Sequence, residues 1–247
     1  MTLFQATGLQ KRFGSRIVLE NITLGIEEGT VHGIMGPNGA GKTTCFHLLT
    51  GHYAPDAGTI RFAGRDITGL APHRIARLGI ARSFQIMNLF DDTVVIENVM
   101  LALPAFRARS GSLFGDCFAN TRLIDAALAV LDMVGLAEKA WSGTKALSYG
   151  DRRALEIAVA LAAEPRVVFL DEPTSGLGAE ATRALASLIR RLRARYTICL
   201  IEHDMRFLFE LADTISVIHW GQVITEGTPA ELTSNKWVAR SALGEVV

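Results

Sequence analysis

The chain has 247 residues, the length of one large domain or two small ones. Its 25 lysines and arginines balance its 25 aspartates and glutamates, which argues against a protein whose main task is to bind nucleic-acid backbones or acidic lipid. Hydrophobic residues make up 49% of the chain and charged residues 20%, a composition that excludes a disordered polymer.

Three sequence features indicate a location inside the cell. No run of residues approaches the ~18 uninterrupted apolar positions needed to cross a bilayer, and the N-terminus lacks the charged-then-apolar order of a signal peptide. The three cysteines, Cys45, Cys117 and Cys199, form no CxxC pair, which suits a reducing cytoplasm and indicates no structural zinc site. We therefore expect a cytoplasmic chain that acts at a membrane, if at all, as a peripheral partner.

Short apolar runs separated by glycine turns dominate the first part of the chain. They predict strands over residues 2–9, 17–26, 31–35 and 59–62. The third of these leads directly into a glycine-rich turn and then into a helical pattern over 43–49. A strand, a glycine loop and a helix in succession are typical of α/β folds.

The middle of the chain has a different character. Residues 94–101 and 121–136 carry apolar side chains at helical spacing, and we interpret 107–118 between them as a loop or short insertion. This pattern predicts a helical subdomain over about 90–159. It would be inserted into a core formed by 1–89 and 160–247, all within a single domain over 1–247.

Helices and buried strands alternate in the last part of the chain. Apolar runs without alternation predict strands buried on both faces over 167–170, 197–201 and 214–219. Helical patterns over 153–163, 179–194 and 205–211 separate them. Helices between buried strands are typical of a parallel sheet with crossover connections, so the predicted fold class is α/β.

One motif predicts nucleotide binding. It matches G-x-x-x-x-G-K-[ST] and comprises Gly36, Pro37, Asn38, Gly39, Ala40, Gly41, Lys42, Thr43 and Thr44. Glycines let backbone N–H groups curl around a phosphate at a helix N-terminus. Lys42 reaches the β- and γ-phosphates, and the Thr43 hydroxyl binds Mg²⁺. The alternative, a chance match, is disfavoured by its position between a strand and a helix.

Two carboxylates, Asp171 and Glu172, follow the apolar run 167–170. Ligands of open parallel sheets bind at this end of the strands. Asp171 is predicted to hold Mg²⁺ and Glu172 to polarise the attacking water, while the metal and Lys42 stabilise charge on the transferring phosphoryl group. The alternative is a solvated strand end before Pro173.

A further motif and its order carry a family resemblance. Residues 147–151, Leu-Ser-Tyr-Gly-Asp, resemble the LSGGQ signature of ATP-binding cassette (ABC) ATPases. Gln85, the loop 175–178 and His203 stand in the order of that family. The resemblance covers nearly the whole chain. It implies a P-loop NTPase (RecA-like) parallel-sheet core, an N-terminal antiparallel β subdomain, an inserted α-helical subdomain, and two ATP molecules sandwiched between two subunits.

The resemblance also implies roles for single residues. Phe13 would stack on adenine, Gln85 would sense Mg²⁺ and the attacking water, and His203 would contact the γ-phosphate. Ser148 and Gly150 would close over the partner subunit's γ-phosphate from a helix N-terminus. The alternatives are a core or turn aromatic for Phe13, a polar strand-end residue for Gln85 and a structural role for His203.

Three residues depart from the family pattern. Tyr149 stands where the usual signature has Gly, Asp151 where it has Gln, and Gly178 where the loop after the acidic pair usually has Asp. The last departure puts cross-talk between the two ATP sites in doubt. A partner cassette with a more usual loop could compensate, so both a homodimer and a heterodimer stay open.

Residues 70–85, 88–90, 95–99 and 226–229 resemble the ATPases of branched-chain amino-acid importers. This implies integral-membrane permease subunits, a second ABC ATPase subunit and a separate solute-binding protein as partners, no nucleic acid, and a peripheral position on the cytoplasmic face of the inner membrane. Close relatives in the group serve other small solutes. A soluble ABC ATPase acting on DNA or ribosomes is disfavoured by the neutral charge, and a weakly hydrolysing regulatory subunit stays open.

The apolar segment 86–90, Ile-Met-Asn-Leu-Phe, directly follows Gln85. Four apolar residues in five fit either a buried core or an apolar surface groove that receives a short helix of the permease. In the second case, movement of the helical subdomain on ATP binding would move Gln85 and the groove together.

Overall fold

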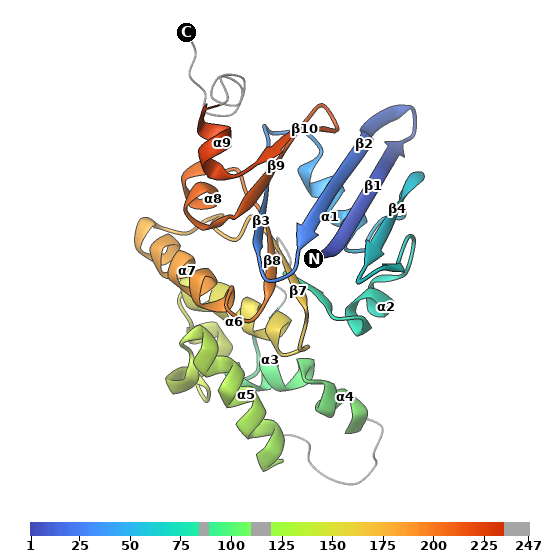
Figure 1. The fold of residues 1–247 in the computed structure, drawn as a ribbon. Helices are drawn as coiled ribbons and strands as arrows, with labels where there is room; N and C mark the ends of the chain where they lie inside the picture. Colours follow the sequence, from blue (N-terminus) through green and yellow to red (C-terminus); the bar gives the residue numbers. More distant parts are fainter. Residues whose placement is uncertain (84–88, 110–119, 235–247) are drawn as a thin grey trace.

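A mixed sheet runs through the protein in a computed structural model that describes residues 1–83, 89–109 and 120–234 (Figure 1). Within these residues the sheet has ten strands, in the order β5-β4-β1-β2-β10-β9-β3-β8-β7-β6. The strands are β1 (Thr2–Phe13), β2 (Arg16–Glu27), β3 (Val31–Met35), β4 (Ala57–Phe62), β5 (Arg65–Asp66), β6 (Ile80–Arg82), β7 (Val167–Asp171), β8 (Thr197–Ile201), β9 (Thr214–His219) and β10 (Gln222–Gly227).

Five neighbouring strands, β9, β3, β8, β7 and β6, are parallel to one another. Every residue of β3, β7 and β8 is buried, which for β7 and β8 confirms the prediction from their unalternating apolar runs, and β9 is buried except at its two end residues. In the register of these strands, Ile201 pairs with both Ile34 and Asp171. The segments that follow β3, β7 and β8 therefore leave the sheet at the same edge.

The sheet is covered on both faces by two separate hydrophobic clusters. On one face Val168 and Leu200 pack with helices α3 (Val95–Ala102), α5 (Thr121–Val134), α6 (Tyr149–Leu161), α7 (Ala179–Leu192) and α8 (Met205–Leu211). On the other face Phe169 and Ile201 pack with α1 (Lys42–Leu49) and the inner faces of β1, β2 and β4. Alternate residues of each parallel strand thus pack into different clusters.

The antiparallel strands lie together at one side of the molecule, where β1 pairs with β2 and with β4, and β4 pairs with β5 (Figure 1). Strand β10 joins the two parts of the sheet, because it pairs antiparallel with β9 and parallel with β2. Helices α3, α5 and α4 (Pro104–Arg109) lie at the far end from the β1–β2 hairpin (Figure 1).

Most predicted elements are present, but one predicted loop and one predicted helix start at other residues than expected. The predicted loop 107–118 is wrong at its start, because 107–109 belong to α4, and a proline at the first turn of a helix is favourable; residues 110–119 lie outside the described part. Helix α6 begins four residues before the predicted position 153, because the Ser148 side chain caps it by accepting from the Asp151 N–H. The elements missed entirely are β5, β6, β10, α2 (Pro72–Arg77), α4, α9 (Pro229–Ser234) and the single-turn helices η2 (Ala137–Lys139) and η3 (Thr144–Ala146).

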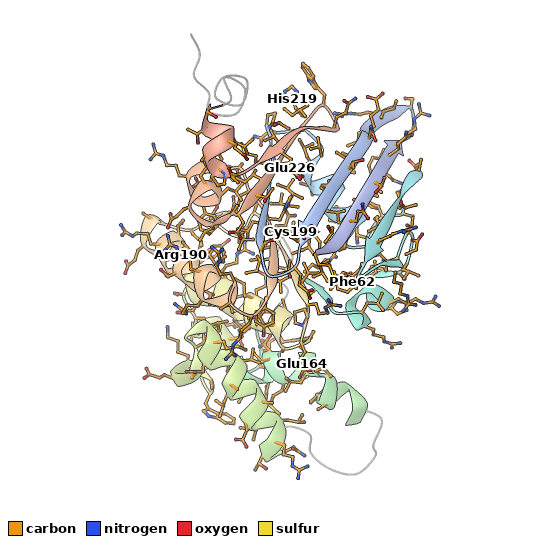
Figure 2. All side chains as sticks on the ribbon, viewed as in Figure 1. Phe62, Glu164, Arg190, Cys199, His219 and Glu226 are labelled. Atoms are coloured by element: carbon orange, nitrogen blue, oxygen red, sulfur yellow. The ribbon has the colours of Figure 1, made fainter. Side chains whose placement is uncertain are left out.

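The end of α7 carries a basic run, Arg190, Arg191, Arg193 and Arg195, of which two arginines form ion pairs. Arg190 lies on the outer side of the helix and pairs with Glu210 of α8, and Arg193 pairs with Asp213 (Figure 2). These cations lie at the C-terminal end of a helix, where the helix dipole favours positive charge. The run is therefore accounted for as a solvated helix end.

Phe169 of β7 packs against two other elements. Its ring lies edge-on to the rings of Phe4 of β1 and Phe46 of α1, with centroid separations of 5.3 and 6.2 Å. Because Phe169 is fully buried, we expect Phe169→Ala to lower the free energy of unfolding by about 3–5 kcal/mol. Phe90→Ala is the matched control, because Phe90 is 59% exposed. Urea unfolding followed by circular dichroism measures both, and equal effects would contradict this packing.

Candidate nucleotide-binding and hydrolysis site

The phosphate loop connects β3 to α1 and packs tightly against neighbouring backbone. A Cβ atom added at Gly36 would lie 2.1 Å from the carbonyl oxygen of Ile218, and one at Gly41 would lie 2.6 Å from the Leu19 side chain. Gly41 also has a φ of +104°, in the left-handed region that favours glycine. Glycine is therefore required at Gly36 by contact with backbone and at Gly41 by its left-handed conformation.

The N-terminus of α1 presents its donors to the loop. Gly41 precedes the helix and supplies no side-chain cap, and the first turn carries no acidic residue. The first N–H groups of a helix lack partners within the helix, and together with the helix dipole they favour an anion. The ends of β3 and α1 thus form an arrangement suited to a phosphate.

Lys42 lies within this loop and is only 6% exposed. Its Nζ donates to the carbonyl oxygens of Gly36 at 2.8 Å and Pro37 at 3.1 Å. Burial lowers the pKa of Lys42, and the negative charges of Glu172, Asp171 and Glu202 oppose that shift. The ammonium group is therefore positioned between the loop and a set of carboxylates from other strands.

Asp171 ends β7 and is almost completely buried. Burial raises the pKa of Asp171 to about 6, Glu172 and Glu202 add to the shift, and Lys42 and Arg153 oppose it. Its Oδ1 atom is buried and accepts no hydrogen bond from the described residues. A buried carboxylate oxygen without a donor fits an oxygen ligand of Mg²⁺ or of a water bound to it.

Glu172 and His203 leave adjacent strands and approach each other. Glu172 has a φ of +43°, which for a non-glycine residue marks strain of the kind found at functional sites. Its Oε1 lies 3.9 Å from Nδ1 of His203, whose side chain is 55% exposed. The two predicted catalytic side chains therefore border the same space at the edge of the sheet.

Sequence reasoning gave no role to Glu202, although its position directly after an apolar strand was a usable signal. Glu202 is fully buried and accepts hydrogen bonds from the backbone and hydroxyl of Thr174, at 2.8 and 2.7 Å. Its second oxygen accepts from the His203 backbone N–H at 3.2 Å. Glu202 thereby holds the segments after β7 and β8 together.

Sequence reasoning also gave no role to Arg153 of α6. Its buried guanidinium pairs with Glu156 at 2.6 Å and donates to the backbone oxygen of Glu172 at 3.4 Å. Removing one partner of a buried ion pair leaves an uncompensated charge, so this pair constrains the fold strongly. It connects the helix of the signature to the backbone of the predicted catalytic carboxylate.

The signature residues border a cleft of about 750 Å³ between α6 and α7. Ser148, Gly150 and Asp151 line it from α6, and Gly178 lines it from the start of α7. Its lining includes none of residues 36–44. Within the described part of the chain, the phosphate loop and the signature are thus separate surfaces.

Tyr149, the first departure from the usual signature, has a structural partner. Its hydroxyl donates to the backbone oxygen of Ser175 at 3.2 Å, and its ring lies against Gly176. This contact ties the start of α6 to the loop after the acidic pair. At Gly178 a Cβ atom would meet nothing within 4 Å, so space does not explain the glycine there.

Two predicted site residues remain, Phe13 and Gln85. Phe13 ends β1, is 44% exposed and lies edge-on to the Tyr53 ring with 5.3 Å between the ring centroids, so it is not a core residue, and its adenine-stacking role stays a prediction. Gln85 lies outside the described residues, and its metal-sensing role stays a prediction.

The raised pKa of Asp171 gives a stability prediction. Protonation of Asp171 stabilises the folded state at low pH, and this contribution is lost as the pH rises through about 6. We therefore expect Asp171→Asn to increase the free energy of unfolding of the nucleotide-free protein at pH 8 by roughly 1–3 kcal/mol, with a smaller gain near pH 5. Urea unfolding at the two pH values measures this, and unchanged or lower stability at pH 8 would contradict it.

Comparison with known proteins places this geometry in a family. A family model described as ABC transporter matches residues 19–175. The high-affinity branched-chain amino acid transport ATP-binding protein LivG of Salmonella typhimurium (strain LT2) is 38% identical over 260 residues, covering 98% of each chain. The corresponding protein BraF of Pseudomonas aeruginosa is 37% identical over 260 residues, also covering 98% of each.

Solved structures agree with the sequence comparisons. An ATP-binding cassette of an ABC transporter in its ADP conformation aligns with a TM-score of 0.87 at 25% identity, covering 99% of this chain and 100% of the other. A cassette in a dimeric post-hydrolysis state with ADP and Pi aligns with a TM-score of 0.76 at 25% identity, covering 92% and 99%. These findings confirm the predicted P-loop NTPase fold class, and the chain belongs to the ABC transporter family as an ATP-binding ATPase subunit.

Proposed function

We propose that this chain is the ATP-hydrolysing subunit of an importer for branched-chain amino acids or a related small polar solute. The observation that carries the proposal is the convergence of Lys42, Asp171 and Glu172 at the edge where β3 and β7 end. The solute class rests on LivG and BraF, both described as branched-chain amino acid transport proteins.

In this proposal each residue of the edge has one task. Lys42 binds the β- and γ-phosphates, and the nine residues 36–44 surround them. Glu172 accepts a hydrogen bond from the attacking water, and His203 contacts the γ-phosphate beside it. Phe13 stacks on the adenine.

A magnesium ion is the second cofactor of the proposal. Thr43 and Asp171 would hold Mg²⁺, and Gln85 would complete the set. Thr43 is exposed at the start of α1, and the unpartnered Oδ1 of Asp171 fits this task. Bound there, Mg²⁺ supplies positive charge against the developing charge of the transferring phosphoryl group.

The separation of the signature from the phosphate loop supports a dimer. Ser148 and Gly150 lie on a cleft that shares no residue with the loop, so they are free to act on a nucleotide held by a second subunit. That subunit is either a second copy of this chain or another ABC ATPase, and ATP-dependent closure between the two drives transport.

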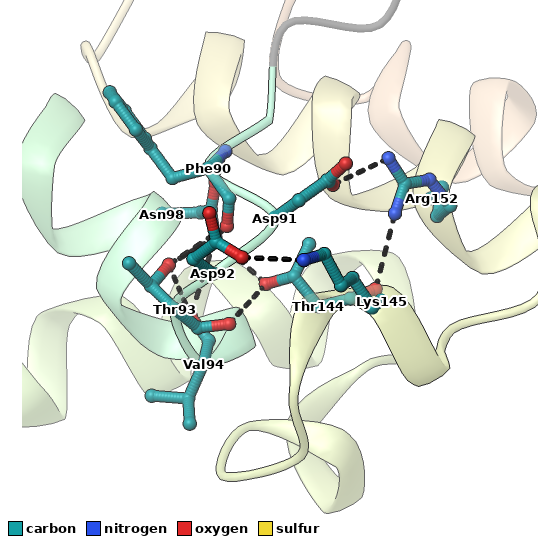
Figure 3. A network of polar contacts seen from close by, with 9 residues as sticks. All are labelled: Phe90, Asp91, Asp92, Thr93, Val94, Asn98, Thr144, Lys145 and Arg152. Atoms are coloured by element: carbon teal, nitrogen blue, oxygen red, sulfur yellow. Dashed lines mark hydrogen bonds and ion pairs between the residues drawn. The ribbon is translucent and has the colours of Figure 1, made fainter.

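The segment from Leu89 to Val94 is our candidate contact for a permease. Leu89 packs against the core, whereas Phe90 is largely exposed, and residues 86–88 of the predicted groove lie outside the described part. Asn98 holds the Phe90 backbone from both sides, accepting from its N–H at 2.7 Å and donating to its oxygen at 3.2 Å (Figure 3).

This segment is also connected to the signature helix. Asp91 pairs with Arg152 of α6 at 2.6 Å, and Asp92 pairs with Lys145 at 2.5 Å (Figure 3). Movement of α6 on dimer closure would therefore carry the segment along. We infer a peripheral position against permease subunits at the cytoplasmic face of the inner membrane, in a transporter that includes a separate solute-binding protein. No helix among the described residues is long and apolar enough to span a bilayer.

Glu172→Gln tests the hydrolytic assignment. This variant is expected to bind ATP, to lose turnover by at least a hundredfold and to accumulate a closed dimer, because removal of general-base assistance typically costs 10²–10⁴-fold in rate. Size-exclusion chromatography with and without ATP measures the dimer, and phosphate release measures turnover. Lys42→Ala is the companion variant, expected to bind ATP weakly and to stay monomeric. Wild-type turnover in either variant would contradict the proposal.

Phe90→Asp tests the permease contact. An exposed contact residue should tolerate the charge, so we expect an unchanged melting temperature and ATP affinity but loss of co-purification with the permease and of solute uptake. Ile224→Asp, an exposed apolar position on β10, is the control and should retain uptake. A folded Phe90→Asp variant with normal uptake would remove this segment from the coupling path.

A further inference from the structure

The signature of this chain carries a carboxylate that its own serine contacts. Ser148 accepts a hydrogen bond from the Asp151 N–H at 3.1 Å and donates its hydroxyl proton to Asp151 Oδ2 at 2.7 Å. The same Oδ2 pairs with Nζ of Lys139 at 2.6 Å. The hydroxyl proton of the signature serine is therefore committed inside the subunit.

Asp151 is charged at neutral pH. Partial burial would raise the pKa of Asp151, but the hydrogen bonds from Lys139 and Ser148 outweigh it, and the net shift is downward. A full negative charge thus lies in the lining of the cleft that, under the proposed function, receives the partner subunit's nucleotide. A carboxylate and a triphosphate brought together repel each other, most strongly when closure removes water from between them.

Lys139 is the cation placed to neutralise this charge. It ends the short helix η2 (Ala137–Lys139), and its side chain is 48% exposed while that of Asp151 is 24% exposed. The two arginines of α6 beside the signature have other carboxylate partners, since Arg152 pairs with Asp91 and Arg153 with Glu156. Among the described residues, Lys139 is the cation paired with Asp151.

We propose that Lys139 is a positioning residue that allows an aspartate-containing signature to close over ATP. As the subunits close, the Ser148 hydroxyl transfers its hydrogen bond from Asp151 to a phosphate oxygen, and Lys139 remains on Asp151 as its counter-ion. This inference rests on the proposed ATP-driven dimer. Without Lys139, Asp151 would hold the serine proton more strongly and would face the triphosphate uncompensated.

Two substitutions should shift the ATP dependence of dimerisation in opposite directions. Lys139→Ala should raise the ATP concentration that half-saturates dimerisation by about two- to fivefold, the range of a partly exposed charge pair. Asp151→Gln removes the repelling charge and should lower that concentration. In the double variant Lys139→Ala should have no further effect, because no charge is left to neutralise.

The experiment is an ATP titration of dimerisation by sedimentation velocity, with all variants made in the hydrolysis-deficient Glu172→Gln background. Nucleotide binding to the monomer and the melting temperature should not change, since Lys139 is remote from the phosphate loop of its own subunit. Lys145→Ala, which breaks the exposed pair with Asp92, is the matched control and should leave the titration unchanged. In 0.5 M salt the Lys139→Ala effect should shrink, because exposed charges are screened.

Each outcome has a distinct meaning. A Lys139→Ala effect that disappears in the Asp151→Gln background supports the proposal. An effect that persists there would overturn it in favour of direct contact between Lys139 and the phosphates, and no effect at all would also overturn it. If the background protein never dimerises with ATP, a dimer of two copies of this chain is wrong, and the role of Lys139 in it is wrong with it.

Discussion

The close approach of three backbone segments around the phosphate loop determines where the chemistry of this protein is located. The loop packs onto the end of β9 at Gly36 and onto β2 at Gly41, and the turn after β9 joins both through Gly221. The Gly221 N–H donates to the Ala40 oxygen at 3.1 Å, and the Gly221 oxygen accepts from the Glu20 N–H at 2.9 Å. Because these contacts leave no room for side chains, the loop and Lys42 have one position relative to the sheet.

The charged side chains around Lys42 come from several elements and form one group at the edge of the sheet. The parallel register brings Asp171, Glu172 and Glu202 to the same edge, with Lys42 and Arg153 as the nearby cations. Burial is the main cause of the raised pKa of Asp171, and the negative charges of Glu172 and Glu202 add to it. A site that carries excess negative charge in the free protein is suited to a metal ion, and stability is given up for binding.

The sequence predicted the parts of this arrangement that are contiguous along the chain. A few consecutive residues are enough to recognise the phosphate loop, the acidic pair after β7 and the buried strands. Strands β6 and β10 were missed because one has three residues and the other alternates polar side chains without a long apolar run. The contacts of Arg153 with Glu172, Tyr149 with Ser175 and Lys139 with Asp151 join separate elements, so no local pattern announces them.

The central claim is that the phosphate loop of one subunit and the signature of another act on the same nucleotide. Hydrogen–deuterium exchange of the Glu172→Gln protein, with and without ATP and Mg²⁺, tests it most directly. We expect ATP to slow exchange both in residues 36–44 and in residues 147–151, and we expect the second effect to be lost on dilution to the monomer while the first remains. Protection confined to the phosphate loop at every protein concentration would contradict the account.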